Sequence, residues 1–223
     1  MTGKACPVCY IVGAGENFGL DFHTQKDDFV IAADGGLVYL EEQKIAADLV
    51  IGDFDSLGKK PEHPNVIALA SEKDDTDMMA AVREGMARGY SCFCIYCGTG
   101  GRIEHTLANI QTLAFLAQNG KRGFLIDKDS IITVISNGSI GFSGCRKGYV
   151  SVFSYSESAA GVCIKGMKYE LENAVLTSDF PIGASNEFAG SAATIAVQAG
   201  TLMVVFPRER SPAKIPPGFH FSN

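Results

Sequence analysis

The sequence predicts an α/β N-terminal domain with a parallel sheet, followed by an all-β sandwich C-terminal domain. In the first 138 residues, short apolar runs alternate with segments of helical period, as in a parallel sheet with crossover helices. After Asn137-Gly138, short apolar strands separated by glycine and serine turns replace this alternation. The length of 223 residues is ample for both parts. We therefore expect domains 1–138 and 139–223.

The composition narrows the class of protein. Hydrophobic residues make up 46% of the chain, charged residues 20%, and the formal net charge is -6. A protein that binds nucleic acid regardless of its sequence needs a basic face, so this charge argues against that class. No apolar run approaches the roughly 20 residues that span a bilayer, and the N-terminus lacks the apolar core of a signal peptide. We expect a cytoplasmic protein with neither a membrane nor a nucleic-acid partner.

Three apolar runs in the N-terminal half end in glycine or aspartate, as parallel strands do when their ends form a ligand crevice. These are residues 8–13, 29–33 and 49–51. The first leads into Gly13-Ala14-Gly15, a turn whose backbone can approach a phosphate, although its spacing to Gly19 departs from a dinucleotide fingerprint. The second ends in Asp34-Gly35-Gly36, where Asp34 either caps a helix over 37–43 or binds a ribose hydroxyl.

The third run leads into Gly52-Asp53-Phe54-Asp55-Ser56, the segment on which the functional interpretation depends. If the chain stays extended there, Asp53 and Asp55 point to one side and Phe54 to the other. Two carboxylates held so close repel each other unless a proton or a cation lies between them, and a magnesium ion would relieve the repulsion. An isolated Asp-x-Asp is more often a polar loop with two solvated side chains, so the remaining motifs decide between these interpretations.

A second acidic segment, Ser71-Glu72-Lys73-Asp74-Asp75-Thr76-Asp77, precedes a predicted helix from Met78 to about Arg88. Thr76 or Asp75 can cap this helix, and the helix dipole favours acids at its start, but these effects account for only part of the cluster. A nearby cation would explain the excess. Lys73 could contact phosphate oxygens as a point charge.

The glycine-rich segment Gly98-Thr99-Gly100-Gly101-Arg102-Ile103-Glu104-His105 precedes a predicted helix over 106–119. Glycines ahead of a helix make an anion site, because free backbone N–H groups and the dipole point there. Arg102 can form a fork with phosphate. The segment is not a Walker A loop, since it lacks the Lys-Ser/Thr pair. His105 is either a packed or capping residue or, beside Arg102 and Glu104, part of the site.

The remaining strands are expected to be short. They are predicted over 66–69, 92–97, 124–126, 131–135, 149–155, 162–164, 174–176, 193–197 and 201–206, with an extended tail over 212–223. Seven cysteines include a Cys6-x-x-Cys9 pair and the cluster Cys92, Cys94 and Cys97. We expect burial as small apolar residues rather than a metal or redox site, because the cluster lies within an apparent strand. The odd count argues against a disulfide framework.

Taken in order, four segments resemble the motifs of the thiamine pyrophosphokinase (thiamine diphosphokinase) family. They are Asp34-Gly35-Gly36, Gly52-Asp53-Phe54-Asp55-Ser56, Lys73-Asp74-Asp75-Thr76-Asp77 and Gly101-Arg102-Ile103-Glu104-His105. In the C-terminal half, residues 166–173 and Ser185-Asn186-Glu187-Phe188 resemble that family's β-domain signatures. The resemblance therefore extends over nearly the whole chain.

The resemblance implies an ATP-dependent diphosphotransferase that moves the pyrophosphoryl group of ATP to the hydroxyl of thiamine, giving thiamine diphosphate and AMP. It implies Mg²⁺ as cofactor and a homodimer with active sites between subunits. Residues 1–138 would bind ATP and magnesium, and 139–223 would bind thiamine. Asp53, Asp55 and Asp77 would hold the metal and, with Arg102, form the catalytic set. The implied ATP-binding residues are Asp34, Lys73, Asp74, Thr76, Arg102, Glu104, His105 and Asn109, and the implied thiamine-binding residues are Ser185 and Asn186.

The sequence departs from the family pattern in two places. Glu104 stands where the family usually has aspartate, so a carboxylate is kept but its reach changes by a methylene. The chain has no tryptophan, whereas some members, notably the eukaryotic ones, stack an indole on thiamine. Phe188 or Phe206 could substitute for it.

The chemistry implied is consistent with these residue types. Attack on the β-phosphorus of ATP needs charge neutralisation and positioning more than covalent help from the protein. A carboxylate of the acidic cluster could accept the hydroxyl proton. Three alternatives remain open: a dinucleotide oxidoreductase using Gly13, Gly15 and Asp34, a metal-dependent nucleotide phosphohydrolase, and a catalytically silent protein that binds thiamine or nucleotide.

Overall fold

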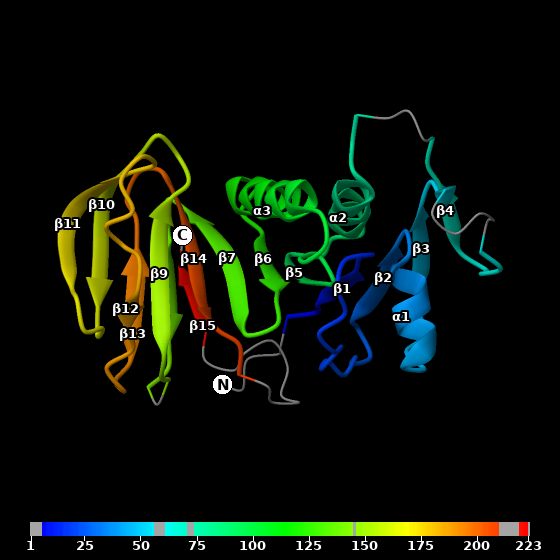
Figure 1. Cartoon of the computed structure of the whole chain (residues 1–223), viewed down its shortest axis with the longest axis horizontal. Coiled ribbons are helices and arrows are strands. Elements are labelled where there is room, and N and C mark those ends of the chain that lie inside the picture. The colour runs from blue at the N-terminus through cyan, green and yellow to red at the C-terminus, as the bar shows by residue number, and fades with distance from the viewer. Residues whose placement is uncertain (1–5, 56–60, 71–73, 145, 210–218, 223) are drawn as a thin grey trace. The chain divides into compact units, whose positions relative to one another are not determined.

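A computed structural model describes residues 6–55, 61–70, 74–144, 146–209 and 219–222 (Figure 1). Ser56 and Lys73, both part of the predicted motifs, lie outside the described residues. The chain divides into two compact units: the first contains the residues up to Thr112 and Gly123–Asp127, and the second contains Leu113–Arg122 and the residues from Lys128 onward. Within the described part, none of the helices combines the length and the apolar character that crossing a bilayer requires.

A parallel sheet organises the first unit. Its strands are β1 (Cys9–Val12), β2 (Phe29–Ala33), β3 (Leu49–Gly52), β4 (Val66–Ala68), β5 (Cys92–Tyr96) and β6 (Arg122–Ile126). They lie in the order β6-β5-β1-β2-β3-β4, and the pairs β5–β1, β1–β2, β2–β3 and β3–β4 are parallel. Every residue of β1, β3 and β5 is buried, which is why these strands are continuous apolar runs rather than alternating ones. The predicted parallel sheet is confirmed.

Three helices connect these strands. Within the described residues they are α1 (Gly36–Glu42), α2 (Asp77–Ala87) and α3 (Ile103–Gln118), which follow β2, β4 and β5 along the chain and are labelled in Figure 1. Both α1 and α2 pack on β1 and β2. Helix α1 begins very close to the end of β1, since a Cβ added to Gly36 would lie 1.9 Å from the carbonyl oxygen of Val12. Only glycine fits at this contact.

The helix starts differ in part from the sequence predictions. The predicted cap by Thr76 is confirmed, because its Oγ1 accepts a hydrogen bond of 3.1 Å from the Met79 N–H. The predicted cap by Asp34 is wrong: the N-cap of α1 is Gly35, without a side-chain hydrogen bond. Helix α3 begins at Ile103 rather than at 106, so its first turn contains Glu104 and His105. The glycines ahead of it allow this earlier start.

The backbone after β3 is not extended. The expectation that Asp53 and Asp55 point to one side and Phe54 to the other required an extended chain, so this condition is not met. Strand β3 ends at Gly52, and Phe54 has a φ of +60°, in the left-handed region. Its ring is buried and lies near Gly52, where an added Cβ would be 3.3 Å from the ring atom Cε1. Burial of this aromatic ring therefore overrides the extended conformation.

The second unit contains antiparallel strands in two arrangements, which confirms the predicted all-β part. One has the order β12-β9-β14-β7 and the other β11-β10-β13-β8-β15. The bounds are β7 (Ser130–Ser136), β8 (Ser139–Phe142), β9 (Tyr149–Ser154), β10 (Ser158–Lys165), β11 (Leu171–Thr177), β12 (Asn186–Glu187), β13 (Ala193–Ala196), β14 (Thr201–Pro207) and β15 (Phe219–Ser222). The rings of Phe188 and Phe206 meet Phe142 edge-on in its core, at centroid distances of 5.1 and 5.3 Å.

The cysteines of the predicted cluster, Cys92, Cys94 and Cys97, are buried thiols that form no disulfide among the described residues. Cys9, Cys92, Cys94 and Cys97 lie in the core of the first unit. Burial raises the pKa of the Cys9 and Cys94 thiols, which keeps them protonated and unreactive. Their predicted role as small core residues is confirmed. Cys6, the partner in the Cys-x-x-Cys pair, is exposed, and its Sγ lies 3.3 Å from Ser91 Oγ.

The contact between α1 and β1 gives a prediction about stability. We expect Gly36→Ala to lower the free energy of unfolding by about 2 kcal/mol or more, because its methyl group would overlap a carbonyl oxygen that belongs to the sheet. The matched control is Gly35→Ala, whose Cβ would meet only the Ala14 side chain at 3.2 Å. This control should stay within about 1 kcal/mol of the wild type. Urea unfolding measures both, and equal effects of the two substitutions would contradict the prediction.

Candidate functional site

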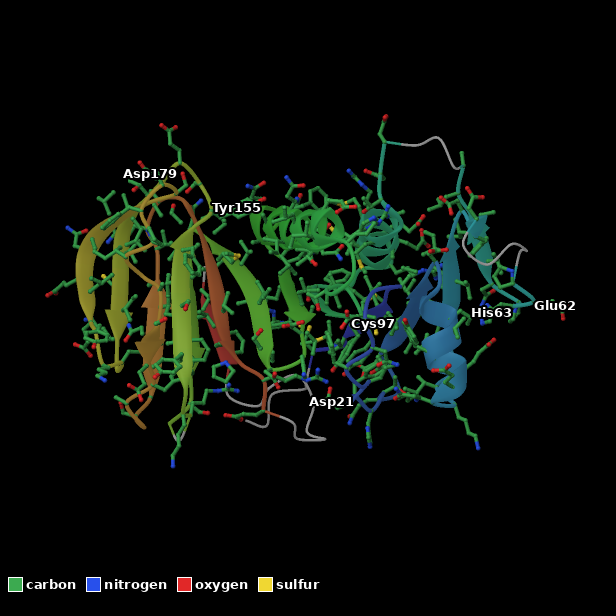
Figure 2. The ribbon with its side chains drawn as sticks, viewed as in Figure 1. Asp21, Glu62, His63, Cys97, Tyr155 and Asp179 are labelled. Carbon is green, nitrogen blue, oxygen red and sulfur yellow. The ribbon has the colours of Figure 1, made fainter. Side chains whose placement is uncertain are left out.

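A cavity of about 400 Å³ opens at the carboxyl edge of the parallel sheet, within the first unit. Its wall comes from segments that are far apart in the sequence: the turn 13–15 after β1, Asp34 after β2, Thr76 and Asp77 at the start of α2, and several residues between Cys97 and Asn109. Cys97, labelled in Figure 2, follows β5 directly. The ligand crevice expected at the strand ends is therefore present.

Two turns of this wall are joined backbone to backbone. The N–H groups of Gly13, Gly15 and Glu16 donate to the carbonyls of Tyr96, Cys97 and Thr99 over 2.9, 2.7 and 2.9 Å. These bonds continue the pairing of β1 with β5 beyond both strands. They need glycine at position 15, where an added Cβ would lie 2.5 Å from the Thr99 carbonyl oxygen.

These backbone hydrogen bonds argue against the alternative function of a dinucleotide oxidoreductase. A dinucleotide-binding turn directs its backbone N–H groups at a pyrophosphate. Here the N–H groups of Gly13 and Gly15 bind carbonyl oxygens of the neighbouring turn instead. The turn forms part of the cavity wall, although the predicted site residues do not include it. The strand followed by two glycines was the signal in the sequence that could have placed it there.

Two helices begin at the cavity. Thr76 and Asp77 of α2, and Arg102 immediately ahead of α3, contribute to its wall. A helix N-terminus presents N–H groups without intrahelical partners and carries a partial positive charge. Two of them directed at one cavity favour an anionic ligand such as a polyphosphate. Helix α3 has 16 residues, so its dipole is fully developed.

Side chains fasten the glycine-rich turn ahead of α3 at two points. Asn109 is buried, with 6% of its surface exposed, and its Nδ2 donates to the Gly98 carbonyl over 2.6 Å. Thr99 Oγ1 donates to Asp127 Oδ1, also over 2.6 Å. Asn109 was predicted to bind ATP. The structure places it in the cavity wall and gives its amide nitrogen a bond that holds the turn.

Arg102 lines the cavity and contacts two polar side chains. Its Nε lies 3.4 Å from Glu104 Oε1, and its Nη2 contacts His105 Nε2. Arg102 and His105 both line the cavity, whereas Glu104 is not part of the wall. The side chains of Arg102 and Glu104 are 70% and 63% exposed, so their ion pair contributes little to stability.

The predicted acidic residues divide into two groups. Asp34 and Asp77 line the cavity; Asp53, Asp55 and Asp74 are not part of its wall. Asp34 nonetheless lies beside the end of β3, because its N–H donates to the Ile51 carbonyl over 2.8 Å. The Asp55 N–H donates to Asp53 Oδ1 over 3.2 Å.

Asp75 of the acid-rich segment forms an ion pair with Arg83 of α2, in which 3.0 Å separate Asp75 Oδ2 from Arg83 Nε.

The donor set of this edge suits Mg²⁺ when the ion binds together with a phosphate. Among the residues that the structure describes, no three His, Cys, Asp or Glu side chains are grouped closely enough to hold a metal ion. Mg²⁺ does not require such a cage, because it takes one or two carboxylates and completes its shell with water and substrate phosphates. Asp34 and Asp77, both in the cavity wall, supply oxygen donors of this kind.

In the second unit, Asn186 holds the backbone of Tyr169. Its Oδ1 accepts from the N–H groups of Tyr169 and Glu187 over 3.0 and 2.8 Å, and its Nδ2 donates to the Tyr169 carbonyl over 2.6 Å. Ser185, the other predicted thiamine-binding residue, is exposed with a φ of +58°. Because its side chain forms three hydrogen bonds to the backbone, Asn186 fixes the position of Tyr169. The ring of Tyr169 itself is exposed.

Phe188 and Phe206 do not provide a stacking surface in place of tryptophan. They are 6% and 1% exposed, and both rings pack against Phe142. The sequence suggested them because they are aromatic, but both side chains lie in the core of the second unit. Tyr169, which is 61% exposed, is the aromatic side chain that Asn186 places at the surface.

Comparison with known proteins gives a consistent result for both halves of the chain. A family model described as "Thiamin pyrophosphokinase, catalytic domain" matches residues 22–125, and one described as "Thiamin pyrophosphokinase, vitamin B1 binding domain" matches residues 139–202. The thiamine pyrophosphokinase of Bacillus subtilis (strain 168) is 28% identical over 190 residues, which cover 82% of this chain and 89% of that protein.

Solved structures agree with this. The crystal structure of thiamine pyrophosphokinase from Bacillus subtilis has a TM-score of 0.81 at 28% identity, covering 91% of this chain and 99% of that one. The thiamin pyrophosphokinase from Geobacillus thermodenitrificans has a TM-score of 0.78 at 26% identity, covering 92% and 100%. Thiamin pyrophosphokinase from Candida albicans, at 14% identity and a TM-score of 0.71 over 92% and 90%, shares the fold.

The buried amide at the cavity gives a prediction. We expect Asn109→Ala to lower the free energy of unfolding by about 1–3 kcal/mol, because the Gly98 carbonyl would lose its donor inside the protein. Asn119→Ala is the matched control, since the Asn119 Nδ2 also donates to a backbone carbonyl, that of Phe115, but at an exposed position. The control should cost only a few tenths of a kcal/mol. Thermal and urea unfolding measure both variants, and an equal loss in both would contradict the assignment.

Proposed function

The chain belongs to the thiamine pyrophosphokinase family, and from this premise we propose that it transfers the intact pyrophosphoryl group of ATP to the hydroxyl of thiamine and releases AMP. The observation that supports this most strongly is the cavity at the carboxyl edge of the sheet, where two helix N-termini meet Arg102 and the carboxylates of Asp34 and Asp77. Positive dipoles and a guanidinium suit the phosphates, and carboxylates suit a divalent cation that accompanies them.

The residues of the first part of the chain would bind and orient ATP. We assign this role to residues 1–138, as the sequence predicts. Arg102, with Lys73, would bind the phosphate oxygens, and the N-termini of α2 and α3 would stabilise negative charge as the transfer proceeds. Thr76 is already engaged as the cap of α2, so it would act by fixing the helix start, as Asn109 does by fixing the glycine turn.

We propose that Asp53, Asp55 and Asp77, with Asp34 beside them, contribute oxygen ligands to Mg²⁺ in the nucleotide complex. Because the described acidic side chains do not form a ready-made metal cage, phosphate oxygens and water would complete the shell of the ion. When bound, the ion would neutralise charge on the polyphosphate and polarise the bond that breaks. A carboxylate of this group would accept the proton of the attacking hydroxyl. Asp74, Glu104 and His105 would complete the surroundings of the nucleotide.

Residues 139–223 would bind thiamine. Ser185 and Asn186 lie in the segment that the sequence assigns to this role, and Asn186 fixes Tyr169 through its backbone. The exposed Tyr169 ring can stack on an aromatic ligand. We further propose a homodimer whose active sites lie between subunits. Light scattering of the purified protein would test the dimer.

The proposed reaction gives a prediction about products. With ATP, Mg²⁺ and thiamine, the protein should form AMP and thiamine diphosphate in equal amounts, and removal of Mg²⁺ with EDTA should abolish both. Chromatography that resolves AMP from ADP measures this. ADP as the product would instead indicate transfer of a single phosphoryl group or hydrolysis, and binding without any nucleotide product would indicate a silent binding protein.

The acidic pair after β3 gives a prediction about catalysis. We expect Asp55→Ala to lower kcat by about 100-fold or more, since a metal ligand contributes several kcal/mol of transition-state stabilisation. The fold should be kept, because Asp55 is exposed. Asp27→Ala, which removes another exposed acid of the first unit, is the matched control and should leave kcat unchanged. Activity of Asp55→Ala close to the wild type, with the melting temperature also unchanged, would refute the assignment of Asp55 to the metal.

A further inference from the structure

Arg102 contacts two side chains from the first turn of the helix that it precedes. Glu104 and His105 lie two and three residues after it, at the start of α3. Glu104 Oε1 is 3.4 Å from Arg102 Nε, and His105 Nε2 contacts Arg102 Nη2. Because these side chains are mostly exposed, the contacts add little to stability. Their effect is on where the guanidinium group points.

The donors and acceptors of this cluster can be assigned. A guanidinium has five N–H donors and no acceptor, so His105 Nε2 must accept from Arg102 Nη2. Glu104 is an ion-pair partner of the guanidinium, with its Oε1 3.4 Å from Nε. Both neighbours of Arg102 therefore present an acceptor atom to it, and both come from the same helical turn.

These two contacts engage one edge of the planar guanidinium, the edge formed by Nε and Nη2. The other edge, formed by Nη1 and Nη2, still has two N–H groups that point in parallel. A phosphate accepts such a pair in a bidentate fork, which a lysine ammonium cannot reproduce. Arg102 lines the cavity at the start of α3, where the helix dipole favours the same ligand.

We propose that Glu104 and His105 are positioning residues, which hold the Arg102 guanidinium oriented for a phosphate group of the nucleotide. This inference rests on the proposed function for the identity of the nucleotide as ATP. A long exposed arginine otherwise samples many rotamers, and binding must order it. Because the two neighbours order it in advance, the ligand meets a prepared donor pair.

The test measures binding of a non-hydrolysable ATP analogue with Mg²⁺ by calorimetry, which needs no turnover. Glu104→Ala and His105→Ala should each weaken binding about 5- to 20-fold. His105→Gln, which keeps a side-chain acceptor, should recover most of the affinity. Gln111→Ala, at an exposed position of the same helix, is the matched control and should bind like the wild type.

A double-mutant cycle distinguishes positioning from independent contact with the ligand. In the Arg102→Ala background, Glu104→Ala and His105→Ala should weaken binding by less than about 2-fold further, because the group that they orient is gone. In steady-state assays, the single variants should raise KM for ATP and leave KM for thiamine unchanged.

The inference would be overturned if the affinity losses of Glu104→Ala and His105→Ala multiplied with the loss caused by Arg102→Ala. It would also be overturned if the two single variants bound the analogue like the wild type. The affinity losses of the variants could fail to multiply while the wild-type protein binds the analogue but forms no AMP with thiamine. This result would refute the proposed reaction and support the positioning role. A wild-type protein that does not bind the analogue would refute both.

Discussion

The cavity depends on one backbone contact, the docking of the turn 13–15 on the turn after β5. The N–H groups of Gly13, Gly15 and Glu16 donate to the carbonyls of Tyr96, Cys97 and Thr99, so two adjacent parallel strands stay joined where their regular pairing ends. This contact fixes one wall of the cavity and the starting point of the glycine-rich segment ahead of α3. Close packing of α1 on the end of β1, at Gly36, adds a second constraint at the same edge. The side chains of the site are therefore carried by a backbone that cannot shift far.

On this backbone, the site combines charges of both signs. The starts of α2 and α3 and Arg102 provide positive potential, and Asp34 and Asp77 provide oxygen donors in the same wall. A bare cluster of carboxylates would repel a nucleotide, and a purely basic cavity would not retain a divalent cation. The mixture suits a ligand that brings both, a polyphosphate with its metal.

Much of the fold could be predicted from sequence because β1, β3 and β5 are buried along their whole length and appear as apolar runs. The strand ends also indicated the edge at which the cavity lies. The errors arose where tertiary packing decides local structure. The ring of Phe54 turns inward and ends the extended chain, and Phe188 and Phe206 lie in the core. The bonds of Asn109 and Asn186 to distant backbone groups leave no periodic signal, so their holding roles could not be predicted.

Three non-glycine residues at this edge share an unusual backbone conformation. Asp34, Phe54 and Cys97 follow β2, β3 and β5, and their φ angles are +50°, +60° and +53°. Residues branched at Cβ are strongly disfavoured in this left-handed region, whereas Asp, Asn and Gly are tolerated. Valine, isoleucine and threonine are thus largely barred from these positions, whatever the ligand requires. The amino acids that evolution can place at this edge of the sheet are consequently limited by the backbone conformation before they are limited by catalysis.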